Sequence, residues 1–188
     1  MRRIDMKEKI LAIAQRLIQT RGVNGFSYAD IAREVGVSKP SLHHHFPTKA
    51  DLVARLMAHY TEQLETYLAS VSEHQNTTID KLKAYTALYR HTLDSERICL
   101  GGMLSAEALT LDAQILPLLR RFFDVQRQWL IKVLTEGTSR GELQLVGAID
   151  QHACTLIAAL QGALVVSRSA GSVEFFDHTV DGLLSHWY

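Results

Sequence analysis

The chain has 188 residues, enough for one large domain or two small ones, and its 47% hydrophobic content predicts a folded core. The net charge of zero hides an uneven division. Residues 1–50 carry nine Lys and Arg against four Asp and Glu (net +5), and residues 51–188 carry eleven against sixteen (net −5). We expect only the basic N-terminal segment to meet a polyanion.

The sequence predicts neither a secretion signal nor a membrane partner. No apolar segment follows the charged start MRRIDMKEK, and the longest apolar stretch, residues 153–166, is too short to cross a bilayer. Two cysteines, Cys99 and Cys154, are too few for a disulfide framework. We therefore expect a cytoplasmic protein with free thiols.

Apolar residues recur at helical spacing through nearly the whole chain, which predicts an all-α fold. The first stripe runs from Ile10 through Leu17 and Ile18, and Gly22 supplies a helix stop. Ser27 followed by Asp30 resembles a capping box, with Asp in place of the usual Glu. It opens a second helix of about two turns.

A glycine-containing turn leads from this second helix into a third. Gly36 is free to take a positive φ, Ser38 can cap the third helix, and Pro47 ends it. Thr48, with Asp51 three residues on, caps a fourth helix. Three helices with this turn predict a helix-turn-helix head over residues 1–48.

The remaining residues, 49–188, are predicted to form a larger helical body. The fourth helix keeps one apolar face from Leu52 to Val71 and connects the head to the body. About nine helices are expected in total, the later ones near residues 79–93, 102–109, 114–139, 148–170 and 172–187.

Three consecutive histidines, His43, His44 and His45, lie in the third helix. Adjacent helical side chains point about 100° apart, so the three cannot converge on one metal ion. A solvated helix with no special role for the histidines is a second interpretation. The flanking residues favour a third one, contact with nucleic acid.

Lys39 and Lys49 stand at the first positions of the third and fourth helices, where a cation opposes the helix dipole. A phosphate there reverses that penalty, because backbone N–H groups and a lysine together form an anion site. The helix face between them offers Ser41, His43 and His44 for hydrogen bonds in a groove.

These residues carry a family resemblance. The stretch GFSYADIAREVGVSKPSLHHHFPTKADL, residues 25–52, resembles the DNA-binding signature of the TetR/AcrR family of bacterial transcriptional regulators. The resemblance implies a homodimeric repressor that binds double-stranded operator DNA and is released by a small-molecule inducer bound in the body. We expect no cofactor and no metal site. DNA contacts are implied for Ser27, Tyr28, Lys39, Pro40, Ser41, His43, His44 and Lys49, the last on a phosphate.

The chain departs from the family at His43, where a tyrosine is usual. A shorter, titratable ring there predicts a mild pH dependence of DNA affinity.

Two DNA-binding heads need a dimer, and the last two predicted helices are the candidate interface. One carries a narrow stripe in which Gly162 permits close approach, and the other has an apolar face of its own. The alternative is that these faces are intrachain core. The predicted dimer residues are Leu156, Leu160, Ala163, Leu164, Phe176, Val180, Leu183 and Leu184.

The middle helices hold residues suited to an inducer cavity, although most of any such set is expected to be core. Tyrosine and tryptophan bring polar groups to an apolar surface and suit an aromatic or mixed-polarity ligand. Glu107 is either solvated or paired with a partner or a cationic ligand. The set is Tyr60, Leu64, Tyr67, Tyr85, Tyr89, Met103, Leu104, Glu107, Phe122, Gln126 and Trp129.

Two other functions are alternatives to a ligand-released repressor. Cys99, near Arg97 at the start of a helix, suggests a regulator that senses oxidants or electrophiles, although a buried inert thiol is the favoured interpretation. A helical enzyme or metal-binding module using the histidines finds no support, since no catalytic triad is readable and the histidines are not clustered with acids. We expect no catalytic residue.

Overall fold

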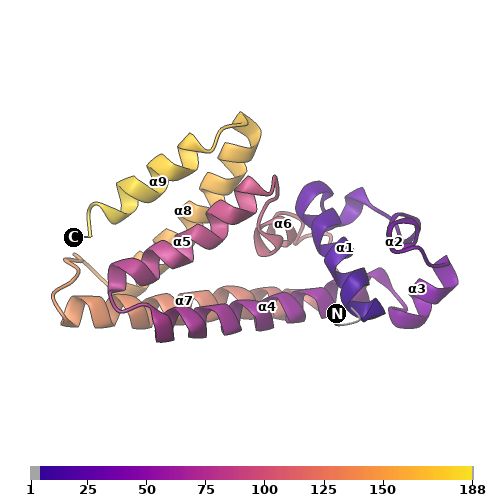
Figure 1. The fold of residues 1–188 in the computed structure, drawn as a ribbon, viewed down its shortest axis with the longest axis horizontal. Coiled ribbons are helices and arrows are strands. Elements are labelled where there is room, and N and C mark those ends of the chain that lie inside the picture. The colour runs from indigo at the N-terminus through magenta and orange to yellow at the C-terminus, as the bar shows by residue number, and fades with distance from the viewer. Residues whose placement is uncertain (1–4, 188) are drawn as a thin grey trace. The chain divides into compact units, whose positions relative to one another are not determined.

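The computed structural model describes residues 5–187, and the regular structure in that range is helical throughout (Figure 1). The order of elements confirms the all-α prediction. The helices are α1 (Met6–Arg21), the 3₁₀ helix η1 (Val23–Gly25), α2 (Tyr28–Val35), α3 (Lys39–His45), α4 (Lys49–His74), α5 (Thr78–Asp94), α6 (Leu100–Ala106), α7 (Ile115–Ser139), α8 (Ile149–Ala170) and α9 (Glu174–Leu184).

Local capping signals set most helix ends where the sequence predicts them. Gly22 follows α1 with φ 77°, and Gly36 ends α2 in the left-handed region with φ 82°. Ser38 Oγ accepts the Ser41 N–H (3.3 Å) at the start of α3. The sixth helix differs slightly from its predicted range of 102–109. It spans Leu100–Ala106, so both of its ends lie a few residues earlier than predicted.

The chain divides into two compact units, each built from two separate segments. Unit 1 combines residues up to Thr61 with Leu100–Phe122, and unit 2 combines Glu62–Cys99 with Phe123–Tyr188. The helix-turn-helix therefore shares a unit with α6 and the beginning of α7. Helices α4 and α7 each contribute to both units.

In unit 1, α1 packs against α2 and α6 through fully buried side chains that include Ile10, Leu17 and Ile18. Leu42 is the buried residue of α3 and anchors it to the head. Ile10, Leu17 and Ile18 belong to the predicted apolar stripe, so helical periodicity identified this part of the core.

A close approach between α6 and α7 makes a first prediction. A Cβ on Gly101 would lie 2.4 Å from the Phe122 ring, which is closer than side chains tolerate. Gly101→Ala is expected to destabilise the protein by about 2 kcal/mol through overpacking, measured by urea denaturation. Adding Phe122→Leu should recover part of this loss. Parent-like stability of Gly101→Ala would contradict the close packing.

In unit 2, α8 packs against α5 and α9, and it buries Leu156, Leu160 and Leu164 there (Figure 1). At 22 residues, α8 is the one helix in the described range that is long and apolar enough to cross a membrane. It is longer than the apolar stretch 153–166, but its most apolar face is internal to the fold.

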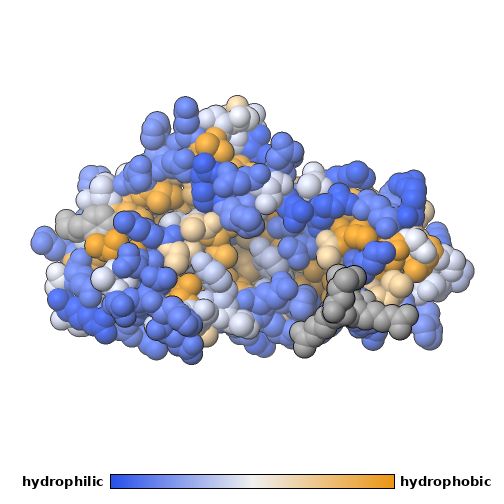
Figure 2. Space-filling view, viewed as in Figure 1, coloured by the Kyte–Doolittle hydropathy of each residue, from blue (hydrophilic) through white to orange (hydrophobic). Residues whose placement is uncertain are grey.

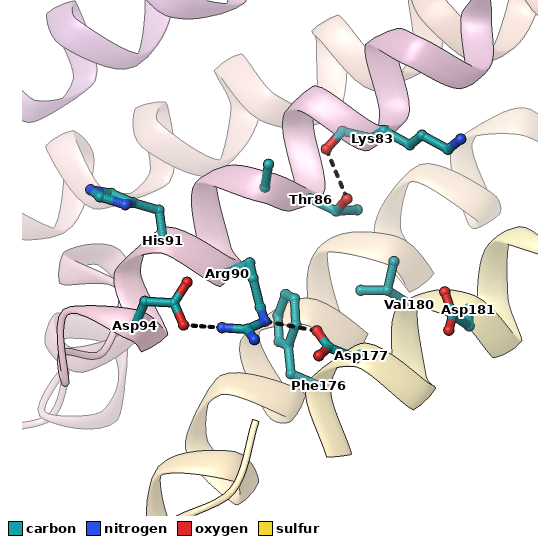
Figure 3. Close-up of a pocket in the computed structure, with 10 residues that line it drawn as sticks. Lys83, Thr86, Arg90, His91, Asp94, Phe176, Asp177, Val180 and Asp181 are labelled. Atoms are coloured by element: carbon teal, nitrogen blue, oxygen red, sulfur yellow. Dashed lines mark hydrogen bonds and ion pairs between the residues drawn. The ribbon is translucent and has the colours of Figure 1, made fainter. Parts of the chain in front are cut away.

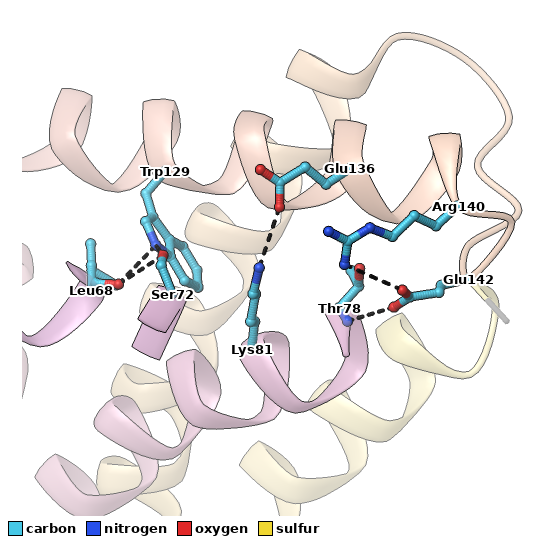
Figure 4. Close-up of polar contacts among 8 residues, drawn as sticks. All are labelled: Leu68, Ser72, Thr78, Lys81, Trp129, Glu136, Arg140 and Glu142. Atoms are coloured by element: carbon cyan, nitrogen blue, oxygen red, sulfur yellow. Dashed lines mark hydrogen bonds and ion pairs between the residues drawn. The ribbon is translucent and has the colours of Figure 1, made fainter. Parts of the chain in front are cut away.

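Polar contacts connect α4, α5 and α7 within unit 2 (Figure 4). The Trp129 indole N–H donates to Leu68 O (3.1 Å) and Ser72 Oγ (2.9 Å), and Lys81 Nζ lies 3.3 Å from a Glu136 carboxylate oxygen. Hydrophilic residues dominate the face shown in Figure 2, where hydrophobic residues form small separate patches.

Candidate nucleic-acid interface

One side of α3 is open to solvent and the other anchors the helix. Lys39, Pro40, His43 and His44 are exposed, whereas Leu42 is fully buried. Ser41 and His45 are half-buried. Positions i, i+1, i+4 and i+5 share one helix face, so the exposed residues form a single surface.

Tyr28 positions α3 from the inside of the head. Its side chain is 7% exposed, and its hydroxyl lies 2.9 Å from Phe46 O and 2.6 Å from Thr48 O. Burial, then the charge of Asp51, raises the pKa of Tyr28 to about 12. The hydroxyl is therefore a neutral donor held by the link between α3 and α4, and the expected DNA contact through it is not supported.

His43 is tied to the same link. Its Nδ1 lies 3.0 Å from Pro47 O, and its ring centroid lies 4.6 Å from that of Tyr28. If Nδ1 donates to that carbonyl, the neutral ring presents Nε2 only as an acceptor. A proton on Nε2 turns it into a cationic donor, which suits a phosphate.

The side chain of Lys49 does not have the exposed position that a phosphate contact would require. Its ammonium donates to the carbonyl oxygens of Val23 and Phe26 (2.6 Å to the latter) and lies 4.1 Å from the centroid of the Phe26 ring. Burial lowers the pKa of Lys49, and the charges of Glu107 and Asp30 oppose that shift. This ammonium is held inside unit 1 rather than directed at a phosphate.

The cap at the start of α4 is also occupied. Thr48 N–H donates to Asp51 Oδ2 (3.1 Å), and Asp51 N–H donates to Thr48 Oγ1 (3.0 Å). Ser27 is committed similarly, because its N–H and its hydroxyl both donate to Asp30 Oδ2 at 2.8 Å. Of the two lysines predicted to bind phosphate, only Lys39 at the start of α3 has an exposed side chain.

The predicted inducer residues are divided between the two compact units. In unit 2, the hydroxyls of Tyr85 and Tyr89 donate to Gln126 Oε1 at 2.8 and 2.6 Å in the buried interior. Unit 2 also holds Leu64, Tyr67 and Trp129, and unit 1 holds Tyr60, Met103, Leu104, Glu107 and Phe122.

Glu107 is not a pocket acid. Its carboxylate accepts the Val23 N–H at 2.6 Å within unit 1. This pairing with a turn 84 residues earlier had no sequence signal. Cys99 is 5% exposed, with Gln161 Nε2 3.4 Å from its sulfur, which matches the favoured inert interpretation.

A surface groove that the sequence did not suggest runs between α5 and α9 and has a volume of about 640 Å³ (Figure 3). Arg90 joins its walls, donating to Asp177 (2.8 Å) on α9 and pairing with Asp94 on α5. None of the predicted inducer residues lines this groove.

The predicted dimer residues lie mostly in the interior of the single chain. Six of the eight, all except Val180 and Leu183, are at most 5% exposed because they pack between α8, α9 and α5. The opposite face of α8 is open instead. Val165 is 53% and Val166 41% exposed, and a Cβ on Gly162 would meet no atom within 4 Å.

Comparisons with known proteins agree with this geometry. The sequence model of the family described as bacterial regulatory proteins, tetR family, matches residues 10–56, which include α2 and α3. A TetR-family transcriptional regulator from Agrobacterium tumefaciens has 30% identity and a TM-score of 0.93, with 97% of each chain covered. A TetR regulator from Legionella pneumophila has 28% identity and a TM-score of 0.91, with 100% of each chain covered.

A curated relative gives the same result over most of its length. The HTH-type transcriptional repressor DhaR of Mycobacterium sp. (strain GP1) is 26% identical over 166 residues, covering 88% of this chain and 83% of DhaR. The chain therefore belongs to the TetR family, and it is a DNA-binding transcriptional regulator rather than an enzyme.

Proposed function

We propose that the protein is a homodimeric, cytoplasmic repressor that binds a palindromic operator and is released by a small-molecule inducer. The observation that carries the proposal is the exposed face of α3, where Lys39, Pro40, His43 and His44 stand together while Leu42 anchors the helix. A short helix held from behind in this way can enter the major groove as a rigid reader.

The exposed residues divide into two roles on DNA. Lys39, at the amino end of α3, binds a phosphate through its exposed side chain. Ser41 and His44 hydrogen-bond base edges, and His43 reaches a phosphate. Lys49 and Tyr28 act indirectly, since their polar groups are bound within unit 1.

The dimer uses the open faces of α8 and α9 rather than their buried stripes. Gly162, Val165 and Val166 form an exposed surface of small and apolar residues on α8. Phe175 on α9 is 47% exposed. Two such helix pairs form a four-helix interface that buries this apolar area and links two heads.

The inducer binds in the helical body near neutral polar groups. The buried Tyr85, Tyr89 and Gln126 cluster offers hydrogen bonds in an apolar interior, which suits a ligand of mixed polarity. Linkage requires that an inducer which weakens DNA binding also bind the DNA-bound protein more weakly, by the same factor.

The experiment for this function is a stoichiometric titration. Fluorescence anisotropy with a duplex selected from random DNA is expected to show two subunits per duplex and an affinity that falls as salt rises. One subunit per duplex, or an affinity independent of salt, would contradict the proposal.

His43 contributes a hydrogen bond to DNA through its imidazole ring. Because His43→Phe keeps an aromatic ring but has no ring nitrogen, it is expected to lower operator affinity by about threefold. His45→Gln, on the half-buried side of α3, is the matched control and should keep the parent affinity. Equal operator affinities of His43→Phe and the parent would refute this role.

A further inference from the structure

The turn between α1 and α2 is held by two opposite charges from distant parts of unit 1. The Glu107 carboxylate accepts the Val23 N–H at 2.6 Å and the Asn24 N–H at 3.4 Å. The Lys49 ammonium donates to the carbonyl oxygens of Val23 and Phe26. The Val23 residue is thus bound by an anion at its N–H and by a cation at its C=O.

The backbone of this turn is shaped to receive the carboxylate. Gly22 has φ +77°, and a Cβ there would lie 2.8 Å from Glu107 Oε1. The Asn24 side-chain amide adds a donor 3.3 Å from the same oxygen. Charge-assisted hydrogen bonds to backbone N–H groups are stronger than neutral ones, so the turn is a small anion site filled by the chain itself.

The position of this turn determines where α3 lies. The turn leads directly into α2, and α2 begins at Tyr28, whose hydroxyl reaches Phe46 O (2.9 Å) at the end of α3. A shift of the turn therefore passes through α2 to the DNA-reading helix.

We infer that Glu107, paired with Lys49 across the turn at Val23, is a positioning residue that sets the placement of α3 for sequence-specific DNA recognition. Neither side chain needs to touch DNA. This inference rests on the proposed DNA-reading role of α3. It predicts that removing either charge harms selectivity for the operator more than general affinity for DNA.

The test compares two variants whose charge changes have opposite signs. Glu107→Ala removes a negative charge, and Lys49→Met removes a positive one while keeping the stem over Phe26. We expect both to lower the ratio of operator affinity to scrambled-duplex affinity about tenfold, the loss expected for one poorly fitted base pair. Glu8→Ala, which removes an exposed acid from α1, should leave that ratio unchanged.

The alternatives give different results. A purely electrostatic role would move general affinity in opposite directions in the two variants and leave the ratio intact, which would overturn the inference. A purely structural role would lower operator and scrambled-duplex binding equally, through the folded fraction, and would also overturn it. Should Glu107→Ala fail to fold, Glu107→Gln retains the shape and is expected to change the ratio in the same direction by less.

A second measurement needs no DNA. The Val23 amide proton resonance of the parent is expected downfield, and it should move upfield in Glu107→Ala but not in Glu8→Ala. An unchanged Val23 resonance would overturn the inference. A parent without operator selectivity would contradict the proposed function and the positioning role together, whereas a selective parent with unaffected variants would contradict the positioning role alone.

Discussion

Val165→Arg is expected to convert the dimer into a folded monomer whose operator affinity is lower by about two to three orders of magnitude. Val165 is 53% exposed on the same face of α8 as Gly162. An arginine from each subunit would place like charges in an apolar interface, which is costly to desolvate. Each monomer would then hold one half-site without the advantage of a linked second head.

The control is Val146→Arg, because Val146 is 91% exposed and lies outside the helices. Sedimentation equilibrium and operator titration should leave this variant dimeric with parent affinity. A dimeric Val165→Arg with parent affinity would contradict the assignment of the α8 face. A monomeric Val146→Arg would show that the effect is not specific to that face.

Gln126→Leu is expected to destabilise the protein by about 3 kcal/mol in urea denaturation. The substitution removes the acceptor that the buried hydroxyls of Tyr85 and Tyr89 share, at 2.8 and 2.6 Å. Burial raises the pKa of Tyr85, so its hydroxyl stays protonated and in need of an acceptor. The apolar replacement has nearly the same size, so lost hydrogen bonding rather than a cavity carries the cost.

A triple variant separates the causes. Tyr85→Phe and Tyr89→Phe with Gln126→Leu remove both hydroxyls, which lie 3.2 Å apart and can bond each other but have two protons to donate, and this variant should be more stable than Gln126→Leu alone. Equal or lower stability of the triple variant would contradict the hydrogen-bond explanation. Glu136→Gln, in the same helix but at a half-buried position, should change stability much less.

Local signals predicted the fold well because they act over a few residues. Gly22, Ser38 and the Thr48 and Asp51 pair start or stop helices through hydrogen bonds to adjacent backbone. Helical periodicity likewise identified buried positions such as Ile10 and Leu17. Neither signal depends on where distant segments of the chain lie.

The site was predicted less fully because its polar side chains form hydrogen bonds with residues that are distant in the sequence. Lys49 has a long stem, and only the tertiary fold places the carbonyls of Val23 and Phe26 within its reach. Glu107 binds a turn 84 residues earlier in the chain. The sequence therefore placed Lys49 correctly at the start of a helix, but it did not indicate the direction of the Lys49 ammonium group.

The predicted dimer residues turn out to be intrachain core for a related reason. Periodicity marks apolar faces but does not say which face packs within the chain. On α8 the stronger stripe, with Leu156 and Leu160, forms intrachain core, and the weaker one with Gly162 and Val165 stays open. Small residues are a poor hydrophobic signal, although they are what close helix contact requires.

The central claim is that the exposed face of α3 reads the operator. The direct measurement is selection from random DNA by the parent, Ser41→Ala, His44→Ala and Lys39→Ala. We expect palindromic half-sites about one helical turn apart or slightly more. Ser41→Ala and His44→Ala should relax preference at particular bases. Lys39→Ala should weaken all sequences and reduce the salt slope by about one per subunit. Unchanged selected sequences and salt slopes in all three variants would contradict the claim.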